Sequence, residues 1–334
     1  MEEKKNGRVF ELDTSGRLEF PCIPEAQLTE EMEKTVEPYL AQYLEYGYRN
    51  DLYYELFFHE DPKGTIVISY GFTESCEKYH EMIYYFHRQG YQVAVQDHRG
   101  HGKSVREVEN KSIVYVRHFH QYVEDLHGFV RDKVVPMKKG KSLYLYAHSM
   151  GGCIGSLYLE RHPNVFERAV LNAPMLGIQL GGMPAWAART LSKGFILFGQ
   201  AKGRVFVTQE FQEEEPFSAS AASSPERHAF YREIQKKNEA FQTSCCSYQW
   251  LSEALKAGKQ VIRPKNMAKV TLPVLLFQAL EDTFVTKREQ DIFIEGISDG
   301  RKITVQSRHE IYRAPNDVLE PYLAEVYSFF EEPL

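Results

Sequence analysis

Apolar positions between residues 50 and 175 follow two alternating patterns. Short continuous runs rich in β-branched and aromatic residues predict strands, some of them buried on both faces. Between these runs, apolar side chains recur every three or four positions, which predicts amphipathic helices. The alternation favours a mostly parallel sheet flanked by helices. The expected strands are 52–58, 65–70, 91–96, 142–147 and 168–172, and the expected helices are 77–88, 118–134 and 150–161.

The alternation stops near residue 175 and resumes near residue 266. The intervening stretch contains several helical segments and no clear series of strands, and it is too long for a structureless loop. We therefore predict a helical cap over 176–265, inserted into an α/β core formed by 46–175 and 266–334. The second part of the core should hold strands at 272–278 and 302–306 and a helix at 316–330. Residues 1–45 are expected to form an N-terminal extension with a helix over 29–44.

Composition narrows the possible partners. Of the 334 residues, 43% are hydrophobic and 26% charged, an ordinary globular mixture. The net charge of -6 offers no basic surface for nucleic acid. No obligate protein partner is implied.

The cysteines and the chain start indicate the compartment. Five cysteines, two of them adjacent and none in a C-x-x-C pair, favour free thiols over disulfides or a zinc site. The first 20 residues lack the apolar core of a signal peptide. The longest apolar runs, such as 272–277, are far shorter than the roughly 20 residues of a membrane-spanning helix. These features predict a cytoplasmic protein.

Ser149 carries the strongest chemical signal. A predicted strand runs into Ala147-His-Ser-Met-Gly151 and then into a predicted helix. Small residues two positions before and after a serine permit the tight turn that presents a nucleophile, although glycine is more usual than alanine at the first of these positions. We expect Ser149 to be a catalytic nucleophile, because a serine hydroxyl must be presented in this way beside a base.

An acid and a base follow Ser149 in the order that such folds require. Asp282 lies just after the predicted strand 272–278, and His309 lies just after the last predicted strand. His309 would take the proton of Ser149, and Asp282 would orient the imidazole. Glu281, adjacent to Asp282, is an alternative acid.

Acyl transfer also needs preorganised N–H donors for the oxyanion. We expect one from Met150, directly after the nucleophile, and one from Phe72, which follows Gly71 in the turn after the strand 65–70.

Two other glycine-rich segments have simpler interpretations. The run 97–104, Asp-His-Arg-Gly-His-Gly-Lys-Ser, lacks the spacing of a metal site and is interpreted as a structural turn. Gly151-Gly152-x-x-Gly155 is not a dinucleotide-binding motif. No metal is expected.

Together these segments resemble the monoglyceride-lipase-like α/β hydrolases, and especially the bacterial lysophospholipases. The similarity begins near residue 50. YGFTESCEKY (70–79) resembles the family's HGxxEHxxRY segment, with Glu74 retained, Tyr70 replacing histidine and Lys78 replacing arginine. The other matching segments, in order, are DHRGHGKS (97–104), Phe119, Tyr122, Asp125 and Leu126 of an FxxYVxDL helix, AHSMGG (147–152), NAPMLGI (172–178), QALEDTFV (278–285) and RHEIY (308–312).

The resemblance implies an α/β-hydrolase fold with a cap over an acyl pocket, hydrolysis of single-chain lipid esters such as lysophospholipids or monoacylglycerols, and no cofactor. It also implies transient contact with a membrane surface. The cap contains apolar residues that could line this pocket, although packing in the protein core would explain any one of them equally well. Candidate pocket residues are Met183, Trp186, Phe195, Phe198, Tyr248 and Trp250, and candidate cations for a phosphate group are Arg189, Lys193, Lys202 and Arg204.

Two other functions stay open at this point. One is a short-chain carboxylesterase or serine peptidase on the same fold, because a fold does not determine a substrate. The other is a non-catalytic ligand-binding protein, against which the presence of Ser149, Asp282 and His309 weighs heavily.

Overall fold

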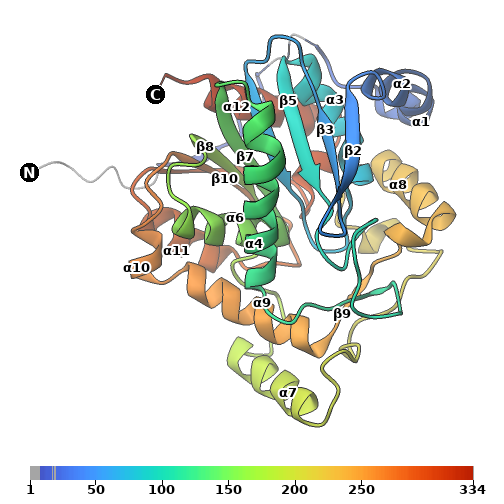
Figure 1. The fold of residues 1–334 in the computed structure, drawn as a ribbon, viewed down its shortest axis with the longest axis vertical. Helices are drawn as coiled ribbons and strands as arrows, with labels where there is room; N and C mark the ends of the chain where they lie inside the picture. Colours follow the sequence, from blue (N-terminus) through green and yellow to red (C-terminus); the bar gives the residue numbers. More distant parts are fainter. Residues whose placement is uncertain (1–7, 17, 19, 334) are drawn as a thin grey trace, which may run out of the picture.

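A nine-stranded sheet forms the centre of the molecule, in a computed structural model that describes residues 8–333 apart from 17 and 19 (Figure 1). The strand order is β1-β11-β10-β8-β7-β4-β5-β3-β2. Strand β3 is antiparallel to β2 and to β5, and the remaining pairs are parallel. The strands are β1 (Arg8–Glu11), β2 (Leu44–Arg49), β3 (Leu52–Phe57), β4 (Gly64–Ser69), β5 (Tyr91–Gln96), β7 (Ser142–His148), β8 (Arg168–Asn172), β10 (Val274–Ala279) and β11 (Gly300–Val305).

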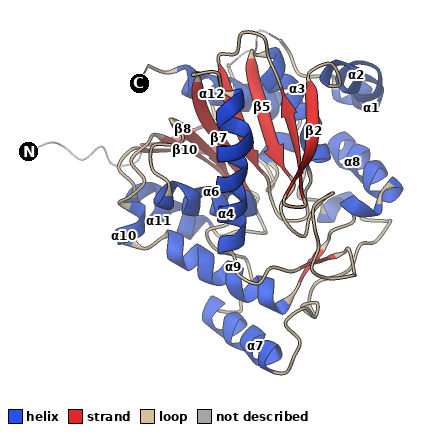
Figure 2. Cartoon of the chain, viewed as in Figure 1, coloured by secondary structure: helices blue, strands red, loops and turns tan. Residues whose placement is uncertain are grey.

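Helices cover both faces of the sheet (Figures 1 and 2). Helices α3 (His80–Arg88) and α12 (Asn316–Glu331) lie on one face, where the rings of Phe86 and Tyr327 are 6.1 Å apart. On the other face α4 (His120–Phe129) packs against α6 (Ser149–Arg161). Helix α11 (Lys287–Gly296) connects β10 to β11 and packs against both.

The short helical turns are η1 (Glu25–Gln27), α1 (Leu28–Glu31), η2 (Met32–Val36), α2 (Glu37–Leu40), η3 (Cys76–Tyr79), η4 (Val130–Val134), α5 (Val135–Met137) and η7 (Ile311–Arg313).

Burial explains why the central strands have no polar face. Every residue of β4, β5, β8 and β10 is buried, because helices or other strands surround them. The predicted α/β-hydrolase fold, a mostly parallel sheet flanked by helices, is confirmed. The predicted core strands and helices agree with the structure to within a few residues.

Two details near the N-terminus differ from the prediction. The helical turns end at Leu40, and Leu44, which we expected to close the helix, begins β2. The apolar residues that recur every four positions and are buried are Leu28, Met32, Val36 and Leu40. This buried stripe therefore begins and ends one helical turn earlier than the sequence pattern predicted. The extension also contains β1, which joins the sheet edge beside β11 and was not predicted.

The chain between β8 and β10 is largely helical. It contains α7 (Ala185–Leu197), η5 (Phe217–Ala219), α8 (Pro225–Lys237), η6 (Glu239–Phe241), β9 (Cys245–Cys246), α9 (Tyr248–Val261) and α10 (Pro264–Met267). Helix α9 contacts α6 of the core, and α7 packs on α9 at one end of the molecule (Figure 1). The two-residue strand β9 pairs with β6 (Ile113–Val114) of the core, a link that we did not predict. The boundaries of the cap at 176 and 265 stay a prediction.

The five cysteines are buried free thiols. Within the described ranges, no helix has the length and apolar character needed to cross a membrane.

Candidate active site

Ser149 stands where strand β7 passes directly into helix α6. Its backbone φ is 49°, in the left-handed region that few residues other than glycine adopt. Such a strained strand-to-helix turn presents the hydroxyl of a nucleophile at the edge of a sheet. Gly151 permits the turn, because a Cβ atom there would lie 1.9 Å from the carbonyl oxygen of Ser69. The segment around Ser149 thus forms the kind of turn that its small residues indicate.

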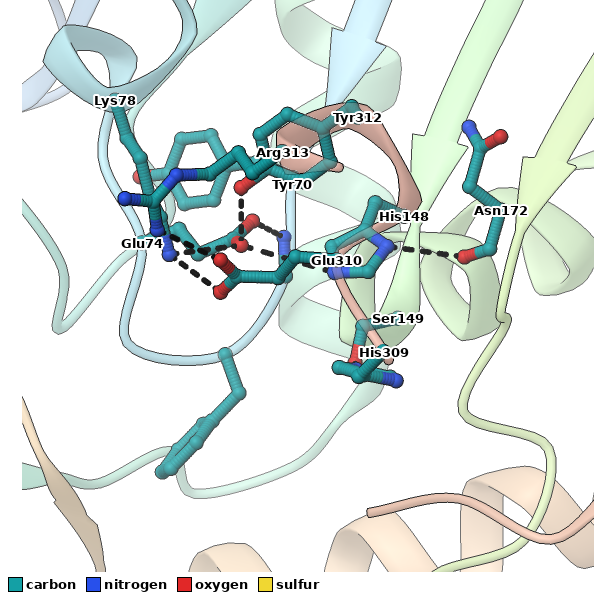
Figure 3. Close-up of polar contacts among 12 residues, drawn as sticks. Tyr70, Glu74, Lys78, His148, Ser149, Asn172, His309, Glu310, Tyr312 and Arg313 are labelled. Atoms are coloured by element: carbon teal, nitrogen blue, oxygen red, sulfur yellow. Dashed lines mark hydrogen bonds and ion pairs between the residues drawn. The ribbon is translucent and has the colours of Figure 1, made fainter. Parts of the chain in front are cut away.

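The imidazole of His309 lies between Ser149 and Asp282. Its Nε2 is 2.8 Å from Ser149 Oγ, and its Nδ1 is 2.6 Å from Asp282 Oδ2. Figure 3 shows Ser149 and His309 side by side. Asp282 follows β10 and His309 follows β11, and the parallel pairing of these strands brings both loops to the same edge of the sheet. The structure therefore brings together the three residues selected from their order in the chain.

Glu281, the alternative acid, lies outside this arrangement. Its side chain is exposed, and its Oε1 accepts a hydrogen bond of 2.6 Å from Gln306 Nε2. The carboxylate beside the imidazole is that of Asp282.

Hydrogen bonds keep the buried Asp282 ionised. Burial acts to raise the pKa of Asp282, but the nearby His309 and the N–H groups of Phe284 and Val285 outweigh it and lower the pKa below its ordinary value. These N–H groups donate to Oδ1 over 2.7 and 3.1 Å, which leaves Oδ2 for His309. An ionised Asp282 accepts the Nδ1–H of His309, so Nε2 faces Ser149 as a proton acceptor.

The two expected oxyanion donors come from neighbouring loops. Met150 is the second residue of α6, so its N–H has no acceptor within the helix. Phe72 follows Gly71 in the turn after β4, and β4 pairs with β7 up to Ser69 opposite Ala147. Both loops therefore leave the sheet at the edge where Ser149 lies.

The candidate pocket residues fall into two groups. Tyr248 and Trp250 are buried, and the ring of Trp250 lies 4.3 Å from that of Phe72, beside the expected oxyanion site. Trp186 and Phe198 are 74% and 87% exposed, so neither side chain lines an enclosed pocket in this structure. Of the two further candidates, Met183 is exposed, and Phe195 stacks on Tyr248 with 4.2 Å between ring centroids.

The segment 97–104 has the local structure of a turn held by a buried carboxylate. Asp97 accepts hydrogen bonds from Tyr70 Oη (2.9 Å), Cys76 N–H (2.8 Å) and Lys103 N–H (2.7 Å). Both carboxylate oxygens of Asp97 thus accept hydrogen bonds from the surrounding fold, as expected of a structural turn.

One group of side chains among the described residues has the spacing of metal ligands, Glu37, Glu77 and His80. Both ring nitrogens of His80 already face carboxylates, Glu37 at 2.8 Å and Glu55 at 3.0 Å. Burial acts against the charged ring, but these two carboxylates raise the pKa of His80 well above its ordinary value. A protonated imidazole cannot bind a metal, so we interpret the group as an ion pair that holds α2 against β3.

Sequence reasoning assigned no role to several polar residues behind Ser149. His148 precedes the nucleophile, its Nδ1 lies 3.1 Å from the carbonyl oxygen of Asn172, and its ring is 4.8 Å from that of His309 (Figure 3). Burial lowers the pKa of His148 to about 4, so the ring is neutral and donates its Nδ1–H to Asn172. Tyr312 and Glu310 follow His309 and contact the turn that carries Phe72 through Glu74 and Lys78. The signals for these residues in the sequence were the segments YGFTESCEKY, AHSMGG and RHEIY, which resemble those of the family.

Comparison with known proteins agrees with this geometry. The family model described as serine aminopeptidase, S33 matches residues 60–316. Lysophospholipase L2 of Escherichia coli K12 is 30% identical over 275 residues, which are 80% of this chain and 80% of that protein. Monoglyceride lipase of Mus musculus is 25% identical over 276 residues, 80% of this chain and 82% of that protein.

A soluble variant of monoglyceride lipase from Saccharomyces cerevisiae has a similar fold, with a TM-score of 0.68 at 17% identity, over 86% of this chain and 94% of that structure. This likeness concerns the fold alone. The resemblance to the monoglyceride lipases and bacterial lysophospholipases is confirmed by the sequence matches. The family model covers more than half of the chain, and the chain therefore belongs to the serine aminopeptidase S33 family of α/β-hydrolases.

Proposed function

We propose that this chain is a serine hydrolase that releases a fatty acid from a single-chain lipid ester, a lysophospholipid or a monoacylglycerol. The observation that carries the proposal is the hydrogen-bonded series Ser149–His309–Asp282, with donor–acceptor distances of 2.8 and 2.6 Å. This series can activate a serine hydroxyl, which has little nucleophilicity of its own.

The reaction proceeds in two steps through an acyl-enzyme. His309 Nε2 takes the proton of Ser149 as Oγ bonds to the ester carbonyl carbon, and the N–H groups of Phe72 and Met150 bind the resulting oxyanion. The carbon–oxygen bond to the alcohol breaks, and His309 returns the proton to the leaving oxygen. Water then gives its proton to His309 and attacks the acyl carbon, which releases the fatty acid and restores Ser149. Asp282 stays ionised and stabilises the imidazolium in both steps.

Sequence relatives support a lipid ester as the substrate. Lysophospholipase L2 and monoglyceride lipase both match along four fifths of the chain. A short-chain esterase or a peptidase is less favoured, because both of these relatives are named for lipid substrates, although the family model is described as an aminopeptidase. A non-catalytic binding protein is also less favoured, because ligand binding alone does not require Ser149 in a strained backbone conformation with its hydroxyl bonded to the imidazole of His309.

An exposed surface of the cap supports transient contact with a membrane. Helix α7 fully buries only the small residues Ala188 and Ser192, and Phe195 and Ile196 are half-buried against the core. Its other large apolar residues, Trp186, Leu191 and Leu197, are exposed. We define the α7 face as its exposed apolar residues and those of the flanking loops: Met183, Trp186, Leu191, Leu197, Phe198, Phe206 and Val207.

The charges of this region suit an anionic lipid surface. Residues 183–207 contain Arg189, Lys193, Lys202 and Arg204 and no acidic residue, although the whole chain has a net charge of -6. Apolar and aromatic side chains combined with basic ones are typical of segments that lie in a membrane interface. We propose that the α7 face rests on the bilayer from which the lipid substrate enters.

The function is tested by measuring free fatty acid released from lysophosphatidylcholine and from monoolein. Ser149→Ala is the blank, and Ser156→Ala is the matched control, because Ser156 is a buried serine of the same helix that bonds only the Gly152 carbonyl. Release that is lost in Ser149→Ala and kept in Ser156→Ala supports the proposal. Fluorophosphonate labelling of wild type without release from either lipid would leave a serine hydrolase but contradict the lipid substrate.

A further inference from the structure

Four charged side chains form a buried cluster behind Ser149, which we call the Glu74 cluster: Glu74, Lys78, Glu310 and Arg313 (Figure 3). Their side chains are only 2–8% exposed. Lys78 Nζ lies 2.6 Å from Glu310 Oε1 and 3.3 Å from Glu74 Oε1, and Arg313 Nη1 lies 2.7 Å from Glu310 Oε2. Burial of charge is costly unless each group is paired, and here every group is.

Glu74 accepts hydrogen bonds on both carboxylate oxygens. Its Oε2 accepts from the N–H of Gly71 at 2.5 Å and from Tyr79 Oη at 3.0 Å. Its Oε1 accepts from Tyr312 Oη at 2.7 Å and from Lys78. Burial acts to raise the pKa of Glu74, but Lys78 and the hydrogen bond from Tyr312 help to hold it below the ordinary value, so the carboxylate is ionised.

These partners belong to the segments that carry the reacting groups. Gly71 directly precedes Phe72, the expected oxyanion donor. Tyr312 lies in the turn η7, which follows His309. His148, the residue before Ser149, has its Nε2 3.7 Å from Glu74 Oε1. Glu74 therefore contacts the oxyanion turn, the histidine loop and the residue before the nucleophile.

The contact with Gly71 leaves the turn little freedom. A Cβ atom at Gly71 would lie 2.9 Å from Glu74 Oε2 and 2.9 Å from His148 Cδ2. The backbone at this position is thus enclosed between the carboxylate and the residue before the nucleophile. A shift of the carboxylate would move the peptide that aims the Phe72 N–H.

The cluster as a whole suits a place beside an oxyanion. The charges of Glu74 and Glu310 are balanced by those of Lys78 and Arg313, so the four groups sum to zero. A lone buried carboxylate beside the oxyanion turn would oppose the developing negative charge. The two cations allow a carboxylate to hold the turn without that penalty.

We propose that Glu74 is a positioning residue, which holds the Gly71–Phe72 turn in the geometry that binds the oxyanion and ties this turn to the loop of His309. The inference rests on the proposed function and adds a residue that acts through Phe72 rather than on the substrate. Loss of the carboxylate should impair the transition state more than the binding of substrate, because the oxyanion exists only after attack.

The test compares Glu74→Gln with wild type, using p-nitrophenyl butyrate and expressing rates per site titrated with a fluorophosphonate. We expect kcat per titrated site to fall by about 10- to 100-fold with KM changed by less than about threefold. Affinity for an alkyl trifluoromethyl ketone, which forms a tetrahedral adduct with the serine, should fall by the same factor as kcat/KM. The matched control is Glu55→Gln, because Glu55 is equally buried but bonds Tyr53 and His80, away from the oxyanion turn.

Unchanged kcat per titrated site in Glu74→Gln would overturn the inference, as would an equal loss in Glu55→Gln. If Glu74→Gln does not fold, Tyr312→Phe removes one hydroxyl and keeps the carboxylate. That variant should lower kcat per site by about three- to tenfold, and an unchanged kcat would overturn the link to the histidine loop. Labelling of wild type at Ser149 tests the proposed function separately, so the two hypotheses can fail independently.

Discussion

Asp282 Oδ2 lies 2.6 Å from Nδ1 of His309, and the two residues are on loops that leave the adjacent parallel strands β10 and β11. The remaining oxygen of Asp282 accepts two backbone N–H groups of its own loop. The carboxylate is therefore fixed before substrate binds, and with it the orientation of the imidazole.

Replacing Asp282 by asparagine should nearly abolish turnover while leaving the fold intact. The amide cannot stabilise the imidazolium and favours the wrong tautomer, a change that lowers kcat by about 10⁴-fold in a well-studied serine protease triad. Steady-state hydrolysis of p-nitrophenyl butyrate measures it. Glu281→Gln is the matched control, since its side chain faces solvent and Gln306. A greater loss in Glu281→Gln than in Asp282→Asn would show that the acid is misassigned.

A methyl group at Gly151 should disrupt the turn of Ser149. The added Cβ would lie 1.9 Å from the oxygen of Ser69 and 2.4 Å from that of Tyr70, both backbone atoms that cannot rotate away. Overpacking of this kind typically costs about 1–3 kcal/mol or more. We expect Gly151→Ala to lower Tm by several degrees, about 2–4 °C for each kcal/mol, and to lose fluorophosphonate labelling.

Gly194 provides the control for this substitution. It lies in α7 with nothing within 4 Å of an added Cβ. Alanine is favoured over glycine in a helix by about 1 kcal/mol, so Gly194→Ala should keep or raise Tm. An equal Tm for Gly151→Ala and wild type would mean that the backbone of β4 yields more easily than its contacts indicate.

The buried imidazole of His98 should make the fold less stable in acid. Burial lowers the pKa of His98 to about 4, against about 6.5 for an exposed histidine. Between these values the unfolded chain binds a proton that the folded chain does not, so stability falls as the pH falls from about 6.5 towards 4. Other buried groups add to this loss of stability. The substitution His98→Gln removes the contribution of one titrating group, and the difference from wild type measures that contribution.

His98→Gln preserves the local contact, because Gln Nε2 can donate to the Tyr70 carbonyl that His98 Nε2 contacts at 3.1 Å. Urea unfolding at several pH values should give a variant whose free energy of unfolding declines less steeply between pH 6.5 and 4. The difference in slope should approach about 1.4 kcal/mol per pH unit, the value for one proton. Parallel curves for the two proteins would contradict a neutral buried His98.

The sequence predicted those features that depend on local pattern or on chain order. Strand 91–96 agrees with β5 because six buried residues between turns leave few alternatives. Parallel strands place the loops that follow them at one edge of the sheet. The order of residues along the chain therefore indicates which of them lie close together, and this allowed the selection of Ser149, Asp282 and His309.

Features that depend on remote partners could not be predicted. Strand β1 has only four residues, and it is a strand because it pairs with β11, which lies nearly the whole chain away. Trp186 and Phe198 were candidates for an acyl pocket because they are apolar residues of the cap, but they are exposed, and α7 buries Ala188 and Ser192. The buried role of Glu74 depends on Tyr312 and Lys78, and their side chains meet only in the folded structure.

The exposure of the α7 face leads to the last prediction. Leu197 and Phe198 are 85% and 87% exposed, an arrangement that buries little apolar area on folding but leaves that area free for contact with lipid. Leu197→Ser combined with Phe198→Ser should weaken binding to vesicles of phosphatidylglycerol, as measured by co-sedimentation, and should leave hydrolysis of the soluble p-nitrophenyl butyrate unchanged.

The matched control replaces Tyr46 and Tyr48 by serine, because these side chains are 66% and 61% exposed on the edge strand β2, away from α7. Charge reversal of Lys193 to glutamate should reduce binding to the anionic vesicles, since each basic residue near such a surface contributes about 1 kcal/mol, and added salt should diminish that difference. If the serine substitutions on β2 weakened vesicle binding as much as those on α7, the contact would not be specific to the α7 face. Equal binding of wild type and the α7 variant would remove the membrane contact from the proposed function while leaving the chemistry of Ser149 untouched.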